Sequence, residues 1–216
     1  ATMPGDIIAL ARRFMNQPVH IRTQDSQDEG RVVARIEQHV FRAHALDKIE
    51  MLARILQADG RGPTIVFCRT KRTAQKTADD LIERGFIASS IHGDLGQGAR
   101  EKALNDFKSG KCEILIATDV AARGIHVDDV AFVIQVDPPE EYKTYLHRSG
   151  RTGRANKEGT VITLIPRSRR RRMEDLLRRA ERDGIFSEVR PASELLVELA
   201  GPIAPIPAPE SLDFGD

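Results

Sequence analysis

Short apolar runs alternate with amphipathic segments from about residue 32 onward, and this alternation limits the possible folds more than any other feature. Runs such as "TIVFCR" (64–69), "EILIAT" (113–118) and "VAFVIQV" (130–136) are short enough for strands buried on both faces. The segments between them repeat apolar residues at helical spacing, and Gly85 and Gly110 end two of them. This order predicts βαβ units and therefore an α/β protein, a three-layer α/β/α fold around a central, mainly parallel sheet.

The same criteria predict further strands at 39–43, 87–92 and 160–165, and helices at 45–57, 73–85, 97–110, 140–150 and 168–184. In open sheets of this kind, ligands bind outside the carboxyl ends of the strands. The candidate sites are therefore the strand-to-helix junctions that follow Arg69, Ile91 and Thr118.

Composition narrows the class of protein. Hydrophobic residues make up 40% of the 216 residues and charged residues 30%, as in soluble globular proteins, and a net charge of +1 excludes a global polycation. We interpret Cys68 and Cys112 as reduced, buried residues of a cytoplasmic protein, and we expect no metal site. Without a run of about 18 apolar residues or a signal peptide, neither membrane insertion nor secretion is expected.

Four segments combine small residues, hydroxyls and cations, and we expect each at the carboxyl end of a strand. They are "VFCRTKR" (66–72), "HGDLGQGARE" (92–101), "ATDVAARGIHV" (117–127) and "HRSGRTGRA" (147–155). Glycine lets the backbone approach a ligand closely, N–H groups and hydroxyls donate hydrogen bonds, and arginine supplies charge. This combination indicates phosphate binding.

In this order and spacing, the four segments resemble motifs of the second, C-terminal RecA-like domain of DEAD-box RNA helicases. The resemblance runs from about residue 32 to 166, and the His-Arg opening of the fourth segment favours the DEAD-box group over its relatives. The opening "ATMP" resembles the end of a motif in the first RecA-like domain of that family. We therefore expect a remnant of that domain (1–23), a linker (24–31), the second RecA-like domain (32–184) and an extended or disordered proline-rich tail (185–216).

The resemblance implies an ATP-dependent RNA helicase. Arg151 and Arg154 would act as arginine fingers on ATP held across the interdomain cleft, where forked guanidinium groups suit the charge of phosphoryl transfer. The implied nucleotide-binding residues are Gly124, His126, Arg151 and Arg154, the RNA-binding residues are Arg69, Thr70, Gly93, Gln97, Arg100 and Thr118, and the interdomain residues are His147, Arg148, Asp119 and Arg123. Asp119 and Arg123 also fit an ordinary loop ion pair.

The sequence contains neither GxxxxGK[ST] nor Asp-Glu-Ala-Asp. We therefore expect the first domain to hold ATP with its Mg²⁺, and we do not expect this chain to hydrolyse ATP alone. Two alternatives remain open: a DNA-directed helicase of superfamily 2, or a non-catalytic RNA-binding module.

One position departs from the family pattern. Gly124-Ile125-His126 stands where the family usually has an aspartate that meets the nucleotide ribose. A neutral imidazole can bond a hydroxyl, but the carboxylate acceptor is lost. We predict that His126→Asp lowers the KM for ATP in the two-domain enzyme; an unchanged KM would count against this.

The stretch "RSRRRR" (167–172) is basic in a nearly neutral chain. It fits a solvated helix face. It also fits an auxiliary contact to RNA or the ribosome through Arg169–Arg172, beside the main RNA groove.

Overall fold

The computed structural model describes residues 36–58, 61–122, 127, 130–153, 158–190 and 193–194. All of them belong to the unit Val32–Asp216. The predicted remnant (1–23) and linker (24–31) lie outside the described residues. The elements in chain order are β1 (Ile36–Arg42), η1 (Ala45–Asp47), α3 (Lys48–Leu56), β2 (Thr64–Cys68), α4 (Lys71–Glu83), β3 (Ala88–Ile91), α5 (Gln97–Lys108), β4 (Ile114–Thr118), α6 (Asp119–Ala122), β5 (Phe132–Gln135), α7 (Tyr142–Ser149), β6 (Gly159–Ile165), η2 (Arg167–Arg169), α8 (Arg170–Arg179) and β7 (Ile185–Glu188).

The strands form one seven-stranded sheet in the order β3-β4-β2-β5-β6-β1-β7, and every pairing between them is parallel. The predicted α/β fold with a parallel sheet is thus confirmed. Strands β2 and β4 are buried at every residue, as expected for apolar runs in the middle of a covered sheet.

The predicted tail boundary is wrong. Ile185–Glu188 form β7, which pairs with β1 at the edge of the sheet, so the ordered domain continues past residue 184. Residues 191–192 and 195–216 lie outside the described part.

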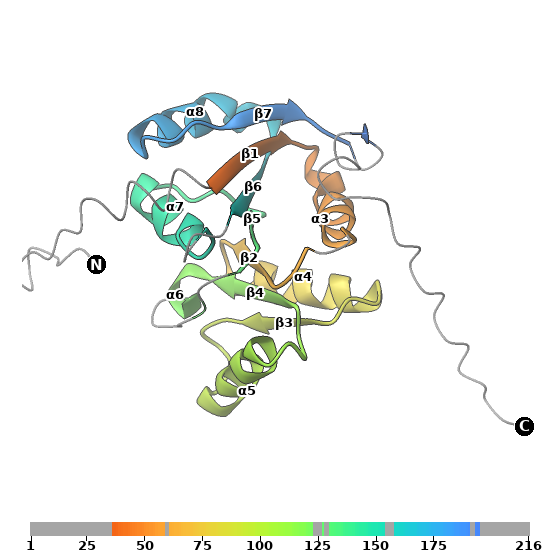
Figure 1. The fold of residues 1–216 in the computed structure, drawn as a ribbon. Coiled ribbons are helices and arrows are strands. Elements are labelled where there is room, and N and C mark those ends of the chain that lie inside the picture. Colours follow the sequence, from red (N-terminus) through yellow and green to blue (C-terminus); the bar gives the residue numbers. More distant parts are fainter. Residues whose placement is uncertain are drawn as a thin grey trace, which may run out of the picture. The chain divides into compact units, whose positions relative to one another are not determined.

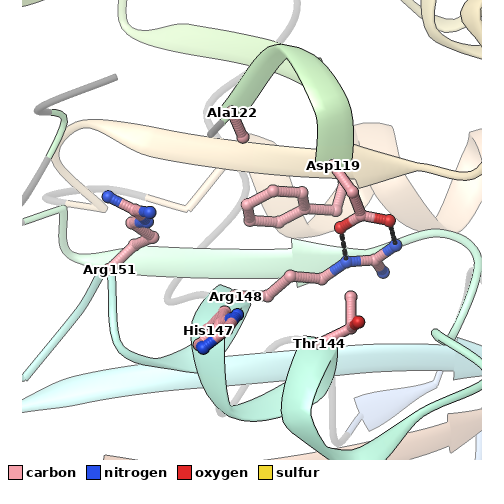
Figure 2. A pocket seen from close by; sticks show the side chains of 7 residues that line it. Asp119, Ala122, Thr144, His147, Arg148 and Arg151 are labelled. Atoms are coloured by element: carbon pink, nitrogen blue, oxygen red, sulfur yellow. Dashed lines mark hydrogen bonds and ion pairs between the residues drawn. The ribbon is translucent and has the colours of Figure 1, made fainter. Parts of the chain in front are cut away.

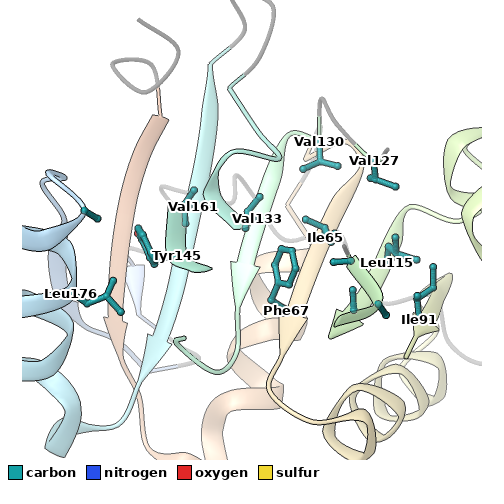
Figure 3. Packing of buried hydrophobic residues seen from close by; sticks show 14 of the residues in the cluster. Ile65, Phe67, Ile91, Leu115, Val127, Val130, Val133, Tyr145, Val161 and Leu176 are labelled. Atoms are coloured by element: carbon teal, nitrogen blue, oxygen red, sulfur yellow. The ribbon is translucent and has the colours of Figure 1, made fainter. Parts of the chain in front are cut away.

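Helices cover both faces of the sheet, giving the three layers of the fold. Figure 1 shows α3 and α4 on one side, with α7 and α8 on the other. On the first side, apolar residues of α3 and α4 pack against the sheet and form one hydrophobic core. On the second side, apolar residues of α5, α6, α7 and α8 pack against the sheet and form another. In Figure 3 this second core contains Phe67, Val133, Val161, Tyr145 and Leu176.

The register aligns the carboxyl ends of neighbouring strands. Cys68 at the end of β2 lies opposite Thr118 at the end of β4, and Phe67 lies opposite Gln135 of β5. Ile91 of β3 lies opposite Ala117. The loops after β2, β3, β4 and β5 therefore leave the sheet along one edge, as the parallel topology requires.

Cys68 and Cys112 are buried and free, as predicted. Burial raises the pKa of the Cys68 thiol to about 12, so this group is a neutral packing residue. Within the described ranges, no helix has the length and apolar character needed to cross a bilayer. Nor does that part of the chain contain a cluster of three or more His, Cys, Asp or Glu side chains able to hold a metal ion.

Candidate functional site

A bidentate ion pair joins the third (117–127) and fourth (147–155) of the four segments described above. Asp119 begins α6 directly after β4, and Arg148 lies in the last turn of α7. Arg148 Nε donates to Asp119 Oδ1 at 2.6 Å and Nη2 donates to Oδ2 at 2.7 Å (Figure 2). Parallel bonds of this kind fix orientation as well as charge.

The rest of the Arg148 guanidinium also bonds inside the domain. Nη1 donates to Gln135 Oε1 at 3.1 Å and to the Asp137 carbonyl at 2.8 Å, and the group lies 5.0 Å from the centre of the Phe67 ring. Arg148 is only 3% exposed. All of these partners lie within the domain, so the side chain binds α7 to the ends of β4 and β5. Its interdomain role stays a prediction.

The position of α7 is also fixed from its core side. Tyr145 is fully buried and donates a hydrogen bond to Gln38 of β1. Burial raises the pKa of its phenol, so the donor proton is retained. Helix α7 therefore fixes the position of the turn that follows it, which contains Arg151.

A small pocket lies beside the ion pair, between α6 and α7. It has a volume of about 60 Å³ and is lined by Phe67, Asp119, Ala122, Thr144, His147, Arg148 and Arg151. His147 is exposed, and Arg151 is half-buried in the turn that follows α7 (Figure 2). Arg148 pairs with the single carboxylate of the lining, and Arg151 and His147 add a guanidinium and an imidazole to it.

The fourth segment was expected at the carboxyl end of a strand, and this is wrong. It begins in α7, and Thr152 forms a parallel bridge with Val130, which precedes β5. The helix runs back along the sheet, so its end reaches the opposite edge. The backbone after Arg151 thus lies beside the residues that precede β5, while the Arg151 side chain lines a pocket with Asp119, which directly follows β4.

Close backbone packing fixes the turn that carries Arg151. The first residue of β6, Gly159, faces Thr152 and Gly153 so closely that a Cβ there would lie 2.5 Å from the Gly153 nitrogen. Thr152 Oγ1 also donates to the Ala131 carbonyl at 3.0 Å. Gly153 has a φ of 70°, a conformation that favours glycine.

The predicted RNA-binding residues at the ends of β2 and β4 lie along one edge of the sheet. Arg69 and Thr70 are exposed in the loop after β2, and the Thr70 hydroxyl caps α4 by accepting from Thr73 N at 3.1 Å. Thr118 ends β4 next to them and is 7% exposed. Thr118 thus lies beside the other predicted RNA-binding residues, although little of its own surface faces solvent.

The remaining predicted RNA-binding residues follow β3, at the adjoining end of the sheet. Gly93 is exposed in the turn after β3, and Gln97 begins α5. Gln97 Nε2 donates to Glu101 Oε1 at 2.7 Å, while Arg100 lies half-buried in the first turn. The structure therefore brings all six residues to the strands β3, β4 and β2, which are neighbours in the sheet.

Four predicted residues lie outside the described part of the chain: Arg123, Gly124, His126 and Arg154. The possible Asp119–Arg123 pair thus remains a prediction, while Arg148 is the partner that the structure gives Asp119.

Sequence reasoning missed two residues after β5. Asp137 accepts from Lys48 Nζ at 3.3 Å and from the Arg69 backbone N–H at 3.3 Å, and its carbonyl binds Arg148. Glu140 pairs with Arg69 at 3.1 Å. The rule that marked the ends of the other strands applies equally to the run 130–136 and would have found this loop.

Comparison with known proteins agrees with this architecture. Residues 47–156 match the helicase conserved C-terminal domain. The DEAD-box ATP-dependent RNA helicase CshA of Geobacillus kaustophilus is 42% identical over 165 residues, which cover 76% of this chain and 35% of the relative. The chain spans about a third of the length of the curated relatives that it matches.

Solved structures share the fold. A DEAD box protein from Methanococcus jannaschii has a TM-score of 0.68 at 37% identity, covering 87% of this chain and 49% of that one. Dbp5 of S. cerevisiae bound to RNA and ADP BeF3 has a TM-score of 0.75 at 25% identity, covering 92% and 52%. The chain therefore belongs to the helicase conserved C-terminal domain family, as a C-terminal helicase domain of the DEAD-box type.

Proposed function

We propose that this chain is the C-terminal half of an ATP-dependent RNA helicase, in which it lends arginine side chains to ATP and grips single-stranded RNA by its backbone. The observation that carries the proposal is the pocket beside α7. Its single carboxylate, Asp119, is already neutralised by Arg148, and Arg151 and His147 lie on its wall. Such a surface suits anionic oxygen atoms.

The pocket forms one wall of a nucleotide site. Its volume of about 60 Å³ is well below the roughly 300 Å³ or more that encloses a small-molecule ligand. The remaining walls would belong to a first RecA-like domain, together with the Mg²⁺ that accompanies ATP. ATP would supply the phosphoanhydride bond that is cleaved, while Arg151 and Arg154 would orient and balance the charge on its terminal phosphate.

The edge of the sheet formed by β3, β4 and β2 would hold the RNA. Exposed groups there include the Arg69 side chain, the Thr70 hydroxyl and the Gly93 backbone. Such groups contact phosphates and ribose hydroxyls and do not read base edges, so binding would be independent of sequence. The buried thiols of Cys68 and Cys112 fit our proposal of a cytoplasmic location.

Stimulation of ATP hydrolysis by RNA and by DNA of the same sequence tests this function in the full-length protein. We expect RNA to stimulate turnover and DNA to do so at least about tenfold less, because several lost contacts to the 2′-hydroxyl add up. Equal stimulation would favour a DNA-directed helicase. No stimulation by either polymer, in a protein that is folded and binds RNA, would favour a non-catalytic RNA-binding module.

A further inference from the structure

Three arginines from separate parts of the chain converge on one carboxylate. Glu140 Oε1 lies 3.1 Å from Arg69 Nη2 and 3.1 Å from Arg169 Nη1, and Oε2 pairs with Arg172 Nη2. We call these four residues the Glu140 cluster. With three cations and one anion, the cluster keeps an excess of positive charge in a chain whose net charge is only +1.

The sheet order explains why these residues meet. Strands β2, β5 and β6 are neighbours, and all run parallel. Arg69 follows the carboxyl end of β2, Glu140 follows that of β5, and Arg169 and Arg172 follow that of β6. The two outer strands lie about 10 Å apart, at two inter-strand spacings, so Glu140 stands midway between the flanking arginines.

The cluster is open to solvent. Side-chain exposure is 45% for Arg69, 44% for Glu140, 33% for Arg169 and 57% for Arg172. Glu140 and Arg172 also line a groove of about 410 Å³ between α7 and α8. Ion pairs at such exposure are weak, so a stronger anion can displace the carboxylate.

The cluster continues the row of predicted RNA-binding residues. That row follows β3, β4 and β2, and the next strands in the sheet are β5 and β6. Arg69 belongs to both groups. A phosphodiester is an anion that accepts from several guanidinium groups at once, as the Glu140 carboxylate does here.

We propose that Glu140 occupies a phosphate site, and that one phosphate of a bound RNA strand replaces its carboxylate as the partner of Arg169 and Arg172. The RNA path then runs from β3, β4 and β2 onto η2 and α8. This inference rests on the proposed RNA-binding function, and it assigns the basic stretch to the main RNA path as its continuation.

Fluorescence anisotropy with a single-stranded oligoribonucleotide, over a series of salt concentrations, tests the proposal on the 216-residue chain. Glu140→Gln removes the competing carboxylate and should tighten binding by about threefold, the scale of a surface ion pair. The control Glu174→Gln removes the same charge from a residue that pairs only with Arg170 among the described ion pairs. It should have a clearly smaller effect.

The arginines give the second arm. Arg169→Gln and Arg172→Gln together should weaken binding and lower the slope of log K against log salt by about 0.7, the value for one phosphate of a single strand. The control Arg178→Gln removes a cation from the other end of α8, where its partner is Asp175. It should leave the slope nearly unchanged.

Each result decides the matter. Equal effects of Glu140→Gln and Glu174→Gln, or weaker binding by Glu140→Gln, would overturn the displacement of Glu140 by phosphate. If the Arg169/Arg172 variant and the Arg178 variant have equal slopes of log K against log salt, the stretch 167–172 is a solvated basic surface and not part of the RNA path. If the parent chain, folded by circular dichroism, binds no RNA at all, the proposed function fails as well.

Discussion

Under the proposed function, replacement of both Arg151 and Arg154 by alanine in the full-length protein is expected to lower RNA-stimulated ATP turnover by a factor of roughly 10³ to 10⁵, the contribution of an arginine finger to phosphoryl transfer. The reason is geometric as well as electrostatic. Arg151 lies on the wall of a pocket whose carboxylate is already paired, in a turn held by the Thr152 hydroxyl. The measurement is kcat at saturating RNA and ATP.

Two further variants separate charge from shape. Changing both residues to lysine keeps the charge but loses the planar fork, so turnover should remain far below that of the parent enzyme. Arg178→Ala removes an exposed arginine of α8 and should leave turnover unchanged. If the double alanine variant keeps more than about a tenth of parental turnover while folded and bound to RNA, the arginine-finger role is excluded.

The second large effect concerns stability. Asp119→Ala should lower the free energy of unfolding by about 3 kcal/mol, because it leaves the buried Arg148 guanidinium without its carboxylate. Arg148 is 3% exposed and Asp119 is 31% exposed, so the cost falls near the lower end of values for buried pairs. In a domain of this size, that loss lowers Tm by about 10 °C, which thermal unfolding followed by circular dichroism will show.

A second substitution tests the same explanation by restoring stability. Adding Arg148→Met to Asp119→Ala removes the unpaired charge and should restore part of the stability. Glu174→Ala breaks an exposed pair with Arg170 and should change the free energy of unfolding by no more than about 0.5 kcal/mol. If Asp119→Ala costs no more than Glu174→Ala, the ion pair does not hold α6 and α7 together.

The fold was readable from the sequence because the strands that carry it are continuous apolar runs. Strands β2 and β4 lie in the middle of the sheet and are buried throughout, which leaves a strong signal. Strand β7 (Ile185–Glu188) was missed because it follows the last predicted helix and leads into the proline-rich tail. The other four-residue edge strand, β3, lies between two predicted helices, so the alternation of strands and helices indicated it.

The site was predicted less well, since a motif gives the identity of a residue but not the direction of its side chain. Arg148 was predicted as an interdomain residue with His147, Asp119 and Arg123, and its bonds within the domain were not anticipated. Its spacing held the answer, because Arg148 follows Tyr145 by three residues and so shares the buried face of α7. The rule for strand ends would have marked the loop of Asp137 and Glu140, but not its partners. These come from segments far apart in sequence, which only the sheet order brings together.

The bare α-carbon of Gly159 has a consequence for the whole domain. No ligand group belongs to this residue, yet the backbone of the Arg151 turn rests where its side chain would be. Even one methyl group would push that turn outward and carry the guanidinium with it. The position of the Arg151 guanidinium, and with it the role proposed for that group at ATP, therefore depends on a hydrogen atom at the first residue of β6.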